Sequence, residues 1–426
     1  MDLRHGIIHA CNFSNITRMP SFSTAAHPLR RALLCTALAA LFAPLANAQT
    51  APSYLMTRLA QLPEYGRGAD AVRVYGTVDL GAMYTRADHG SGRWQLQSGG
   101  NYSSKLGLYA AEDLGGGLKA EIKLEAGFNA DHGAQQASAL FNRESWVGLR
   151  SRTWGTVRVG NQINAMLPLL IDPFMLVNTN SVYTWIGGGA MQTPRGVGAN
   201  TDLGPGAGTL PVRVPKSITY ATPSALGPMS AQFIYATNPT GANEPRVGTR
   251  GGVVSASHGP IYLAASLIQT WSSPVVVTAG LPAQSVRTDI PSAGAIFDNG
   301  KLVLSASYAR MTPKAAQAGE AALVTLGAIV PDGRLTWRAS AVYRDTDRAR
   351  DNAGRPADSS ALGLMLGADY DLSRRSALYA RAGSVRNFGA STIILNSVAL
   401  PLEAGSTMPQ TGIETRTFSV GMYHHF

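Results

Sequence analysis

The carboxy-terminal segment, residues 415–426, alternates between large apolar and small or polar side chains. One face is mostly apolar and is formed by Arg416, Phe418, Val420, Met422, His424 and Phe426. The opposite face is formed by Thr417, Ser419, Gly421, Tyr423 and His425. Alternation with a period of two is the pattern of a β-strand. We predict a strand with lipid on one side and water on the other, and an edge strand of a soluble sheet is the alternative.

A second segment, residues 119–128, alternates even more regularly. One of its faces is charged and consists of Lys119, Glu121, Lys123 and Glu125. The other face is apolar and consists of Ala120, Ile122, Leu124, Ala126 and Phe128. A row of charges on one face of a strand requires water on that side, with ion-pair partners on the neighbouring strands. In a sandwich this charged face could be an outer surface, whereas in a barrel it lines the water-filled lumen.

The same pattern recurs along most of the chain. It predicts about sixteen strands, at 72–83, 103–111, 118–128, 142–150, 155–162, 216–223, 227–237, 250–257, 261–270, 288–297, 301–311, 320–329, 335–346, 360–370, 377–387 and 416–426. Short turns such as 298–300 alternate with longer loops such as 388–414, and the longest connection is 163–215. Because lipid cannot satisfy a free sheet edge, we expect an all-β fold, a sixteen-stranded antiparallel transmembrane β-barrel over residues 71–426.

Residues 1–48 have the pattern of a leader and signal peptide. Arg30 and Arg31 precede a short apolar run, and Ala46-Asn47-Ala48 matches an A-x-A cleavage site. We predict cleavage after Ala48, with Met19 as a candidate for the true start. Residues 49–70 form an extension whose role, a tail or a plug in the lumen, is left open.

Composition narrows the possible classes of protein. Both cysteines, Cys11 and Cys35, precede the expected cleavage site, so we expect no disulfide or thiol chemistry in the mature chain. The formal net charge of +10 remains positive without residues 1–48. Since no basic cluster is interleaved with aromatic residues, this charge favours anionic solutes over nucleic acid as partners.

Five segments resemble the general porins of Gram-negative bacteria, especially those of the beta-proteobacterial type. The segments are 74–84, 103–129, 140–162, 367–380 and 419–426, and they are spread over nearly the whole mature chain. The resemblance implies a homotrimer in the outer membrane, in contact with lipid and lipopolysaccharide. It also implies an inward-folded third loop, here 163–215, that narrows a pore for passive diffusion of small hydrophilic solutes. No cofactor or metal is expected.

Alternation of side chains also selects the residues that should line this pore. The candidates are Lys105, Lys119, Glu121, Lys123, Glu125, Arg143, Arg158, Asp172, Arg338 and Arg381. Arg143 is placed on the face of Ser145, opposite Trp146, whereas Arg381 lies between two alanines and should face water. The resemblance implies a ladder of basic residues in this region, which Arg143 and Lys105 match and Tyr109 does not.

Only two carboxylates, Asp172 and Asp202, occur in the 163–215 connection. Such a scarcity of acidic groups opposite the basic candidates predicts a positive potential and a weak preference for anions. The alternative is that the basic residues are ordinary solvated charges paired with Glu121, Glu125 or Glu144.

Three other functions are alternatives to an open pore. An enzyme is not expected, because the histidines show neither metal-ligand spacing nor a neighbouring serine motif. A channel selective for organic anions is one alternative. A structural barrel or adhesin with a plugged lumen is another, with 49–70 or the long connection as the plug.

Overall fold

The computed structural model describes residues 72–164, 172–175, 179–223, 226–237 and 247–426. The predicted leader, signal peptide and extension, residues 1–70, lie outside the described residues. No helix within these ranges is both long enough and apolar enough to cross a membrane.

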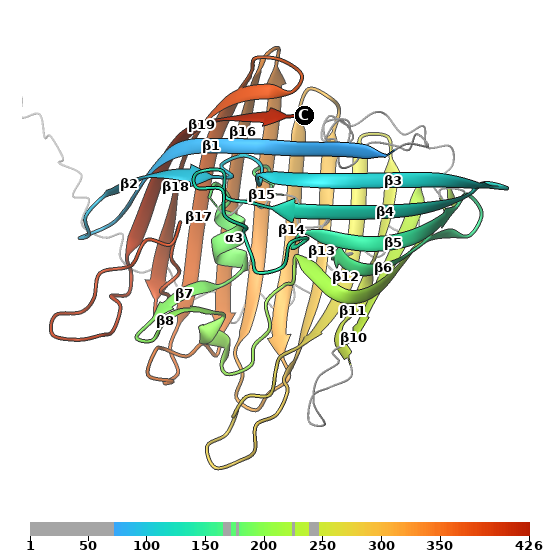
Figure 1. Cartoon of the computed structure of the whole chain (residues 1–426). Helices are drawn as coiled ribbons and strands as arrows, with labels where there is room; N and C mark the ends of the chain where they lie inside the picture. Colours follow the sequence, from blue (N-terminus) through green and yellow to red (C-terminus); the bar gives the residue numbers. More distant parts are fainter. Residues whose placement is uncertain (1–71, 165–171, 176–178, 224–225, 238–246) are drawn as a thin grey trace, which may run out of the picture. The chain divides into compact units, whose positions relative to one another are not determined.

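The described chain forms one large antiparallel sheet and a small hairpin (Figure 1). The first strands of the large sheet are β1 (Arg73–Ala87), β2 (Arg93–Ser98), β3 (Lys105–Gly115), β4 (Leu118–Gly127), β5 (Glu144–Ser151) and β6 (Gly155–Ile163). The chain then forms α3 (Val182–Gly187), the hairpin strands β7 (Ala190–Thr193) and β8 (Gly196–Ala199), and the short helix η3 (Thr201–Leu203). The large sheet continues with β9 (Arg213–Ala221), β10 (Met229–Thr237), β11 (Val247–His258), β12 (Ile261–Trp271), β13 (Arg287–Asp298), β14 (Val303–Pro313), β15 (Glu320–Asp332), β16 (Leu335–Asp347), β17 (Ser359–Asp371), β18 (Ser376–Gly389) and β19 (Glu414–His425).

The seventeen strands of the large sheet occupy sixteen positions in the wall. Residues 73–77 of β1 pair with β3, whereas residues 80–85 pair with β2, so β2 and β3 together form one interrupted strand. β1 also pairs with β19, which closes the sheet on itself. The predicted all-β, sixteen-stranded antiparallel barrel is therefore confirmed.

Backbone hydrogen bonds between the two ends of the barrel complete this closure. The amide of Gly76 donates to the carbonyl of Phe426, and the amide of Phe426 donates to the carbonyl of Gly76, both at 3.1 Å. β19 has the predicted faces, since Phe418 and Met422 are exposed while Tyr423 is buried. Because β19 is paired on both sides, the alternative of a soluble edge strand is excluded.

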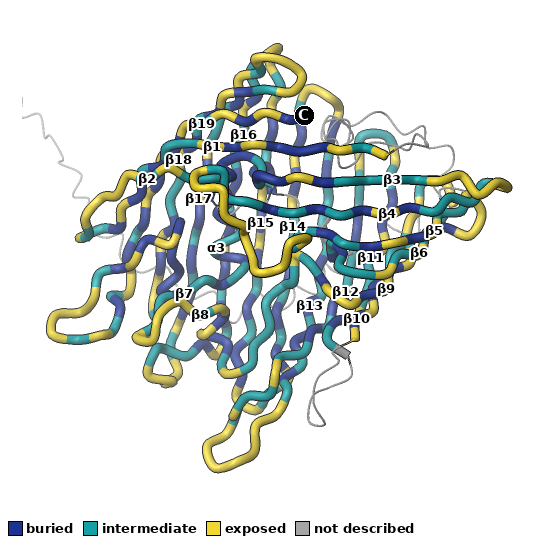
Figure 2. The backbone as a smooth tube through the Cα atoms, in the orientation of Figure 1, coloured by how far each residue is buried: buried dark blue, intermediate teal, exposed yellow. Residues whose placement is uncertain are grey.

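Burial alternates along the strands of the wall (Figure 2). Large apolar side chains are exposed on the outward face, and examples are Leu80, Leu106, Val147, Leu267, Leu326 and Leu366. The inward face carries small, polar and charged residues. This is the division expected of a barrel with lipid outside and water inside.

The described residues between β6 and β9, which we call the inner segment, lie against the inward face of the wall. A Cβ atom at Gly363 of β17 would lie only 2.5 Å from Ile186 Cδ1 and 2.8 Å from Val182 Cβ, so this glycine makes room for α3. Gly327 of β15 makes room in the same way for the ring of Pro173. The neighbouring loop 390–413 adds a hydrogen bond of 3.0 Å from the amide of Ile394 to the carbonyl of Ala190.

Replacing Gly363 by leucine is expected to displace α3 from the wall. The added side chain would overlap Val182 and Ile186, and overpacking of this kind costs about 1–3 kcal/mol. The temperature at which the folded barrel loses its compact, fast-migrating form on a gel would therefore fall. Ala368→Leu, which adds the same bulk to the outward face of β17, should leave that temperature nearly unchanged, and an equal fall in both variants would contradict the packing role of Gly363.

Candidate functional site

Strands β3 to β6 carry a dense group of charged residues on their inward faces. Alternation directs Glu121, Lys123 and Glu125 of β4 to the same side, and all are buried. β5 adds Glu144 and Arg150, and β6 adds Arg158. We call these side chains, together with Lys105 and Arg143, the basic wall, because its basic groups outnumber its carboxylates.

Glu121 is the centre of one half of the basic wall. Tyr109 Oη donates to its carboxylate at 2.7 Å, and Arg150 Nη2 lies 2.8 Å from Oε1. Arg158 Nη2 lies 3.7 Å from Oε2, and its guanidinium is stacked 4.2 Å from the ring centroid of Trp146. The two arginine side chains are 38% and 36% exposed, whereas that of Glu121 is 1% exposed.

Glu125 and Glu144 form the other half. Arg143 Nε lies 2.6 Å from a Glu125 oxygen, and Tyr75 Oη donates to the second oxygen at 2.9 Å. Lys123 Nζ lies 2.6 Å from Glu144 and 3.7 Å from Glu125. These contacts match the alternative in which the basic residues are paired with Glu121, Glu125 and Glu144. At Glu121 and Glu125, however, the carboxylate is more buried than the arginines that pair with it, so the positive groups are the ones left at the surface.

The predicted faces of Ser145 and Trp146 on β5 are wrong. Trp146 is buried on the inward face and donates its Nε1–H to Glu144 at 2.8 Å, while Val147 and Leu149 face outward. Arg143 lies just before β5, so its contact with Glu125 does not depend on the face of Ser145. Trp146 can face inward because its indole N–H finds a carboxylate partner.

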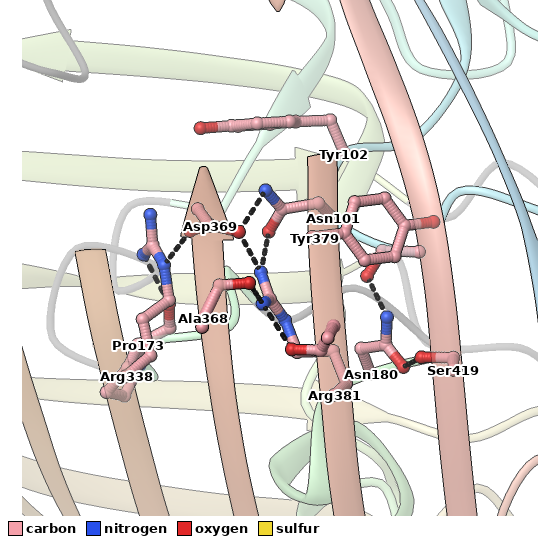
Figure 3. A network of polar contacts seen from close by, with 12 residues as sticks. Asn101, Tyr102, Pro173, Asn180, Arg338, Ala368, Asp369, Tyr379, Arg381 and Ser419 are labelled. Atoms are coloured by element: carbon pink, nitrogen blue, oxygen red, sulfur yellow. Dashed lines mark hydrogen bonds and ion pairs between the residues drawn. The ribbon is translucent and has the colours of Figure 1, made fainter. Parts of the chain in front are cut away.

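Arg338 of β16 and Arg381 of β18 meet at Asp369 of β17 (Figure 3). Arg338 Nε and Arg381 Nη2 each lie 2.5 Å from a different oxygen of Asp369. Arg381 Nη2 also donates to Asn101 Oδ1 at 2.8 Å, and Arg338 Nη1 donates to the carbonyl of Pro173 at 2.7 Å. The expectation that Arg381 faces water is wrong, because its side chain is 0% exposed.

Asn101 belongs to the interruption between β2 and β3, residues 99–104, which the sequence did not predict as a structural element. The buried carboxylate of Asp79 accepts the backbone N–H groups of Gly100, Asn101 and Tyr102 at 3.0, 2.7 and 2.7 Å. Tyr379 Oη donates to the same carboxylate at 2.8 Å. This turn also contacts the inner segment, since Asn180 Nδ2 donates to the carbonyl of Gly100 at 2.5 Å.

Both carboxylates of the inner segment have protein partners. Arg344 Nη2 contacts the two oxygens of Asp202 at 2.7 and 3.0 Å, and Thr346 donates to Asp202 at 2.7 Å. Asp172 is buried and accepts a hydrogen bond from Ser181 Oγ. Burial, and then the charge of Asp172, raise the pKa of Tyr183, so this phenol stays neutral. Asp172 thus lies within the inner segment, hydrogen-bonded to Ser181.

The remaining candidates lie on the predicted face. Lys105 is buried at the start of β3. Lys119 is 24% exposed and lies 3.7 Å from Asp113 near the β3–β4 turn. Arg150 was not among the candidates, although its spacing from Glu144 along β5 places it inward. Within the described ranges, no group of histidine, cysteine and acidic side chains could hold a metal ion.

Comparison with known proteins gives consistent matches over most of the chain. The family model described as Gram-negative porin matches residues 35–390. Outer membrane porin protein 32 of Delftia acidovorans is 30% identical over 370 residues, which are 84% of this chain and 94% of the relative. The major outer membrane protein P.IB of Neisseria lactamica is 27% identical over 348 residues, which are 78% of this chain and 92% of the relative.

A solved structure agrees with these matches. The anion-selective porin from Comamonas acidovorans is 26% identical, with a TM-score of 0.64 over 84% of this chain and 99% of that one. The trimer form of OmpT from Vibrio cholerae, 14% identical with a TM-score of 0.55 over 84% of this chain and 100% of that one, shares the fold. The chain is therefore a member of the Gram-negative porin family, a channel-forming β-barrel of the outer membrane.

Proposed function

We propose that this porin passes small hydrophilic solutes by passive diffusion, with a weak preference for anions. The proposal rests on one observation, which is that the basic wall has buried carboxylates and more exposed arginines. The side chains of Glu121 and Glu125 are 1% and 3% exposed, whereas those of their partners Arg150 and Arg158 are more than one third exposed and that of Arg143 is 14% exposed. A solute that passes this wall meets guanidinium groups before carboxylates, which favours anions electrostatically.

The inner segment is proposed as the constriction opposite the basic wall. Its only carboxylates are Asp172 and Asp202, and both are buried in hydrogen bonds with other residues. Few acidic groups are therefore available to attract cations to the narrowest section. The anion selectivity of the Comamonas acidovorans porin supports the same direction of preference.

The assembly and the membrane contacts are proposed from the resemblance to general porins. We place the barrel in a homotrimer, in contact with lipid and lipopolysaccharide, with its long loops outside the cell. A channel restricted to organic anions remains the second candidate, because exposed arginines above buried carboxylates would also bind a carboxylate solute.

Single-channel recording in a planar bilayer with a potassium chloride gradient tests this function. We expect large ohmic steps and a reversal potential at which the dilute side is negative, because chloride crosses faster than potassium. A reversal potential of the opposite sign would contradict the anion preference. Correctly folded protein without conductance would contradict the open channel and favour the plugged barrel.

A further inference from the structure

The turn 99–104 connects the two sides of the proposed opening. It leads directly into β3, the first strand of the basic wall, and its backbone also contacts the inner segment. Thr179 Oγ1 donates to the carbonyl of Gly99, and Asn180 Nδ2 donates to the carbonyl of Gly100, both at 2.5 Å. The distance between the inner segment and β3 therefore depends on the conformation of this turn.

The carboxylate of Asp79 fixes that conformation. It accepts three successive backbone N–H groups, those of residues 100–102, at 3.0, 2.7 and 2.7 Å, and the hydroxyl of Tyr379 at 2.8 Å. Ser104 Oγ accepts from the Asp79 amide at 3.0 Å and donates to the Asp79 carbonyl at 3.1 Å. An ionised carboxylate suits this position because both of its oxygens only accept hydrogen bonds, so it satisfies all four donors at once.

Two glycines let the backbone wrap closely around this carboxylate. Gly99 has a φ of +81°, in the region that glycine adopts without strain. A Cβ atom at Gly100 would lie only 1.9 Å from Tyr379 Oη, so a larger residue there would push the turn away from its acceptor. The sequence of the turn is therefore suited to one tightly held conformation.

A second set of contacts joins the turn to another part of the inner segment (Figure 3). Asn101 Oδ1 accepts from Arg381 Nη2 at 2.8 Å, and Asn101 Nδ2 donates to Asp369 at 3.2 Å. Asp369 also pairs with Arg338, which donates to the carbonyl of Pro173 at 2.7 Å. The turn is thus linked to the inner segment at two points, and buried polar networks that are satisfied in this way are rigid.

We propose that Asp79 is a positioning residue that sets the width of the channel, because it fixes the turn that attaches the inner segment to the basic wall. Asp79 is 0% exposed, so it acts without touching the solute. With the inner segment held in one position, the open channel has a constant width and a sharp size limit for solutes. The proposal rests on the proposed channel, with the inner segment as its constriction.

The test compares the wild type with Asp79→Asn by single-channel recording in planar bilayers. Each oxygen of Asp79 accepts two of the four hydrogen bonds, so an NH2 group in place of either oxygen leaves two donors without an acceptor. The matched control is Asp298→Asn. Asp298 is another buried carboxylate, and it accepts the backbone N–H of Gly300 at 2.9 Å in the turn between β13 and β14.

A second variant weakens the same attachment from the inner segment and leaves Asp79 in place. Thr179→Val keeps the shape of the side chain but removes the hydrogen bond to the carbonyl of Gly99. Its control is Thr193→Val, which removes a hydrogen bond of 2.8 Å to the carbonyl of Gly196 within the β7–β8 hairpin. If Asp79→Asn does not fold, this second comparison decides the outcome.

Two properties of folded, heat-modifiable protein are recorded. One is the time that an open channel spends in conductance substates, and the other is the largest neutral poly(ethylene glycol) that enters the channel and lowers its conductance. We expect the time in substates to rise about tenfold in both variants, because an unpaired buried donor or acceptor shifts an equilibrium by about that factor. Larger polymers should also enter both variants, while the two controls behave like the wild type.

Unchanged currents from either folded variant would overturn the proposal, as would an equal change in the controls. A purely structural role of Asp79 would lower the unfolding temperature but leave the currents of folded channels unchanged. Hydrogen exchange of residues 179–187 on the same samples separates this role from the channel itself. Exchange that is no faster in the variants overturns the positioning by Asp79, whereas a wild type without conductance contradicts the proposed function.

Discussion

Replacing Arg150 and Arg158 together by glutamine is expected to abolish the anion preference of the channel. These are the two most exposed basic side chains of the basic wall, and both are paired with Glu121. Their removal leaves that carboxylate with Tyr109 as its hydrogen-bond partner. The reversal potential in a salt gradient should therefore fall to about zero or change sign, since selectivity depends on the charges along the pore.

Two further variants make this experiment decisive. Arg355→Gln removes an arginine that is 76% exposed and paired with Asp351 in the loop 348–358, so it should leave the reversal potential unchanged. Adding Glu121→Gln to the double variant removes the carboxylate that has lost both arginine partners and should eliminate a cation preference caused by it. An undiminished anion preference in a conducting Arg150→Gln/Arg158→Gln channel would show that these arginines do not set selectivity.

Replacing Arg344 by methionine is expected to release part of the inner segment from the wall. The Arg344 side chain is 1% exposed and that of Asp202 is 3% exposed, so the substitution leaves a buried carboxylate without its ionic partner. Breaking one side of a buried ion pair costs about 3–5 kcal/mol. Because Arg195 is the only lysine or arginine in residues 164–212, faster trypsin cleavage after Arg195 reports the release.

A compensating variant distinguishes loss of the ion pair from general destabilisation of the barrel as the cause of faster cleavage. Arg344→Met/Asp202→Leu replaces both charges by apolar groups, and such replacements are often close to neutral in stability. We expect it to restore slow cleavage at Arg195. If Arg344→Met is cleaved as slowly as the wild type, the pair does not hold the inner segment in place.

Alternation alone predicts the wall of the barrel because every strand must separate lipid from water. Each of the sixteen predicted segments overlaps one strand position of the large sheet. The rule fails for Trp146, whose size suggests lipid but whose N–H bonds to Glu144 inside. It fails again at β2, where Trp94 and Leu96 are exposed on the outward face in a segment that none of the sixteen predicted strands covers.

Long-range pairing explains what the sequence could not reveal about the site. The turn 99–104 is held by Asp79 and by Arg381, and Arg381 lies 280 positions from its partner Asn101. Arg344 and Asp202 are separated by 142 positions. A local pattern can show that these side chains face inward, but it cannot show which partner removes each one from water.

The closing of β1 on β19 also governs how the protein can be made. Thr77 and His425, whose side chains lie 2.8 Å apart across this seam, are separated by 348 positions in the chain. A nascent polypeptide that lacks its last strand exposes two unpaired edges, and a hydrocarbon environment cannot satisfy them. The wall can therefore close only when β19 is available to pair with β1, and we expect the barrel to complete its insertion after that strand has been made.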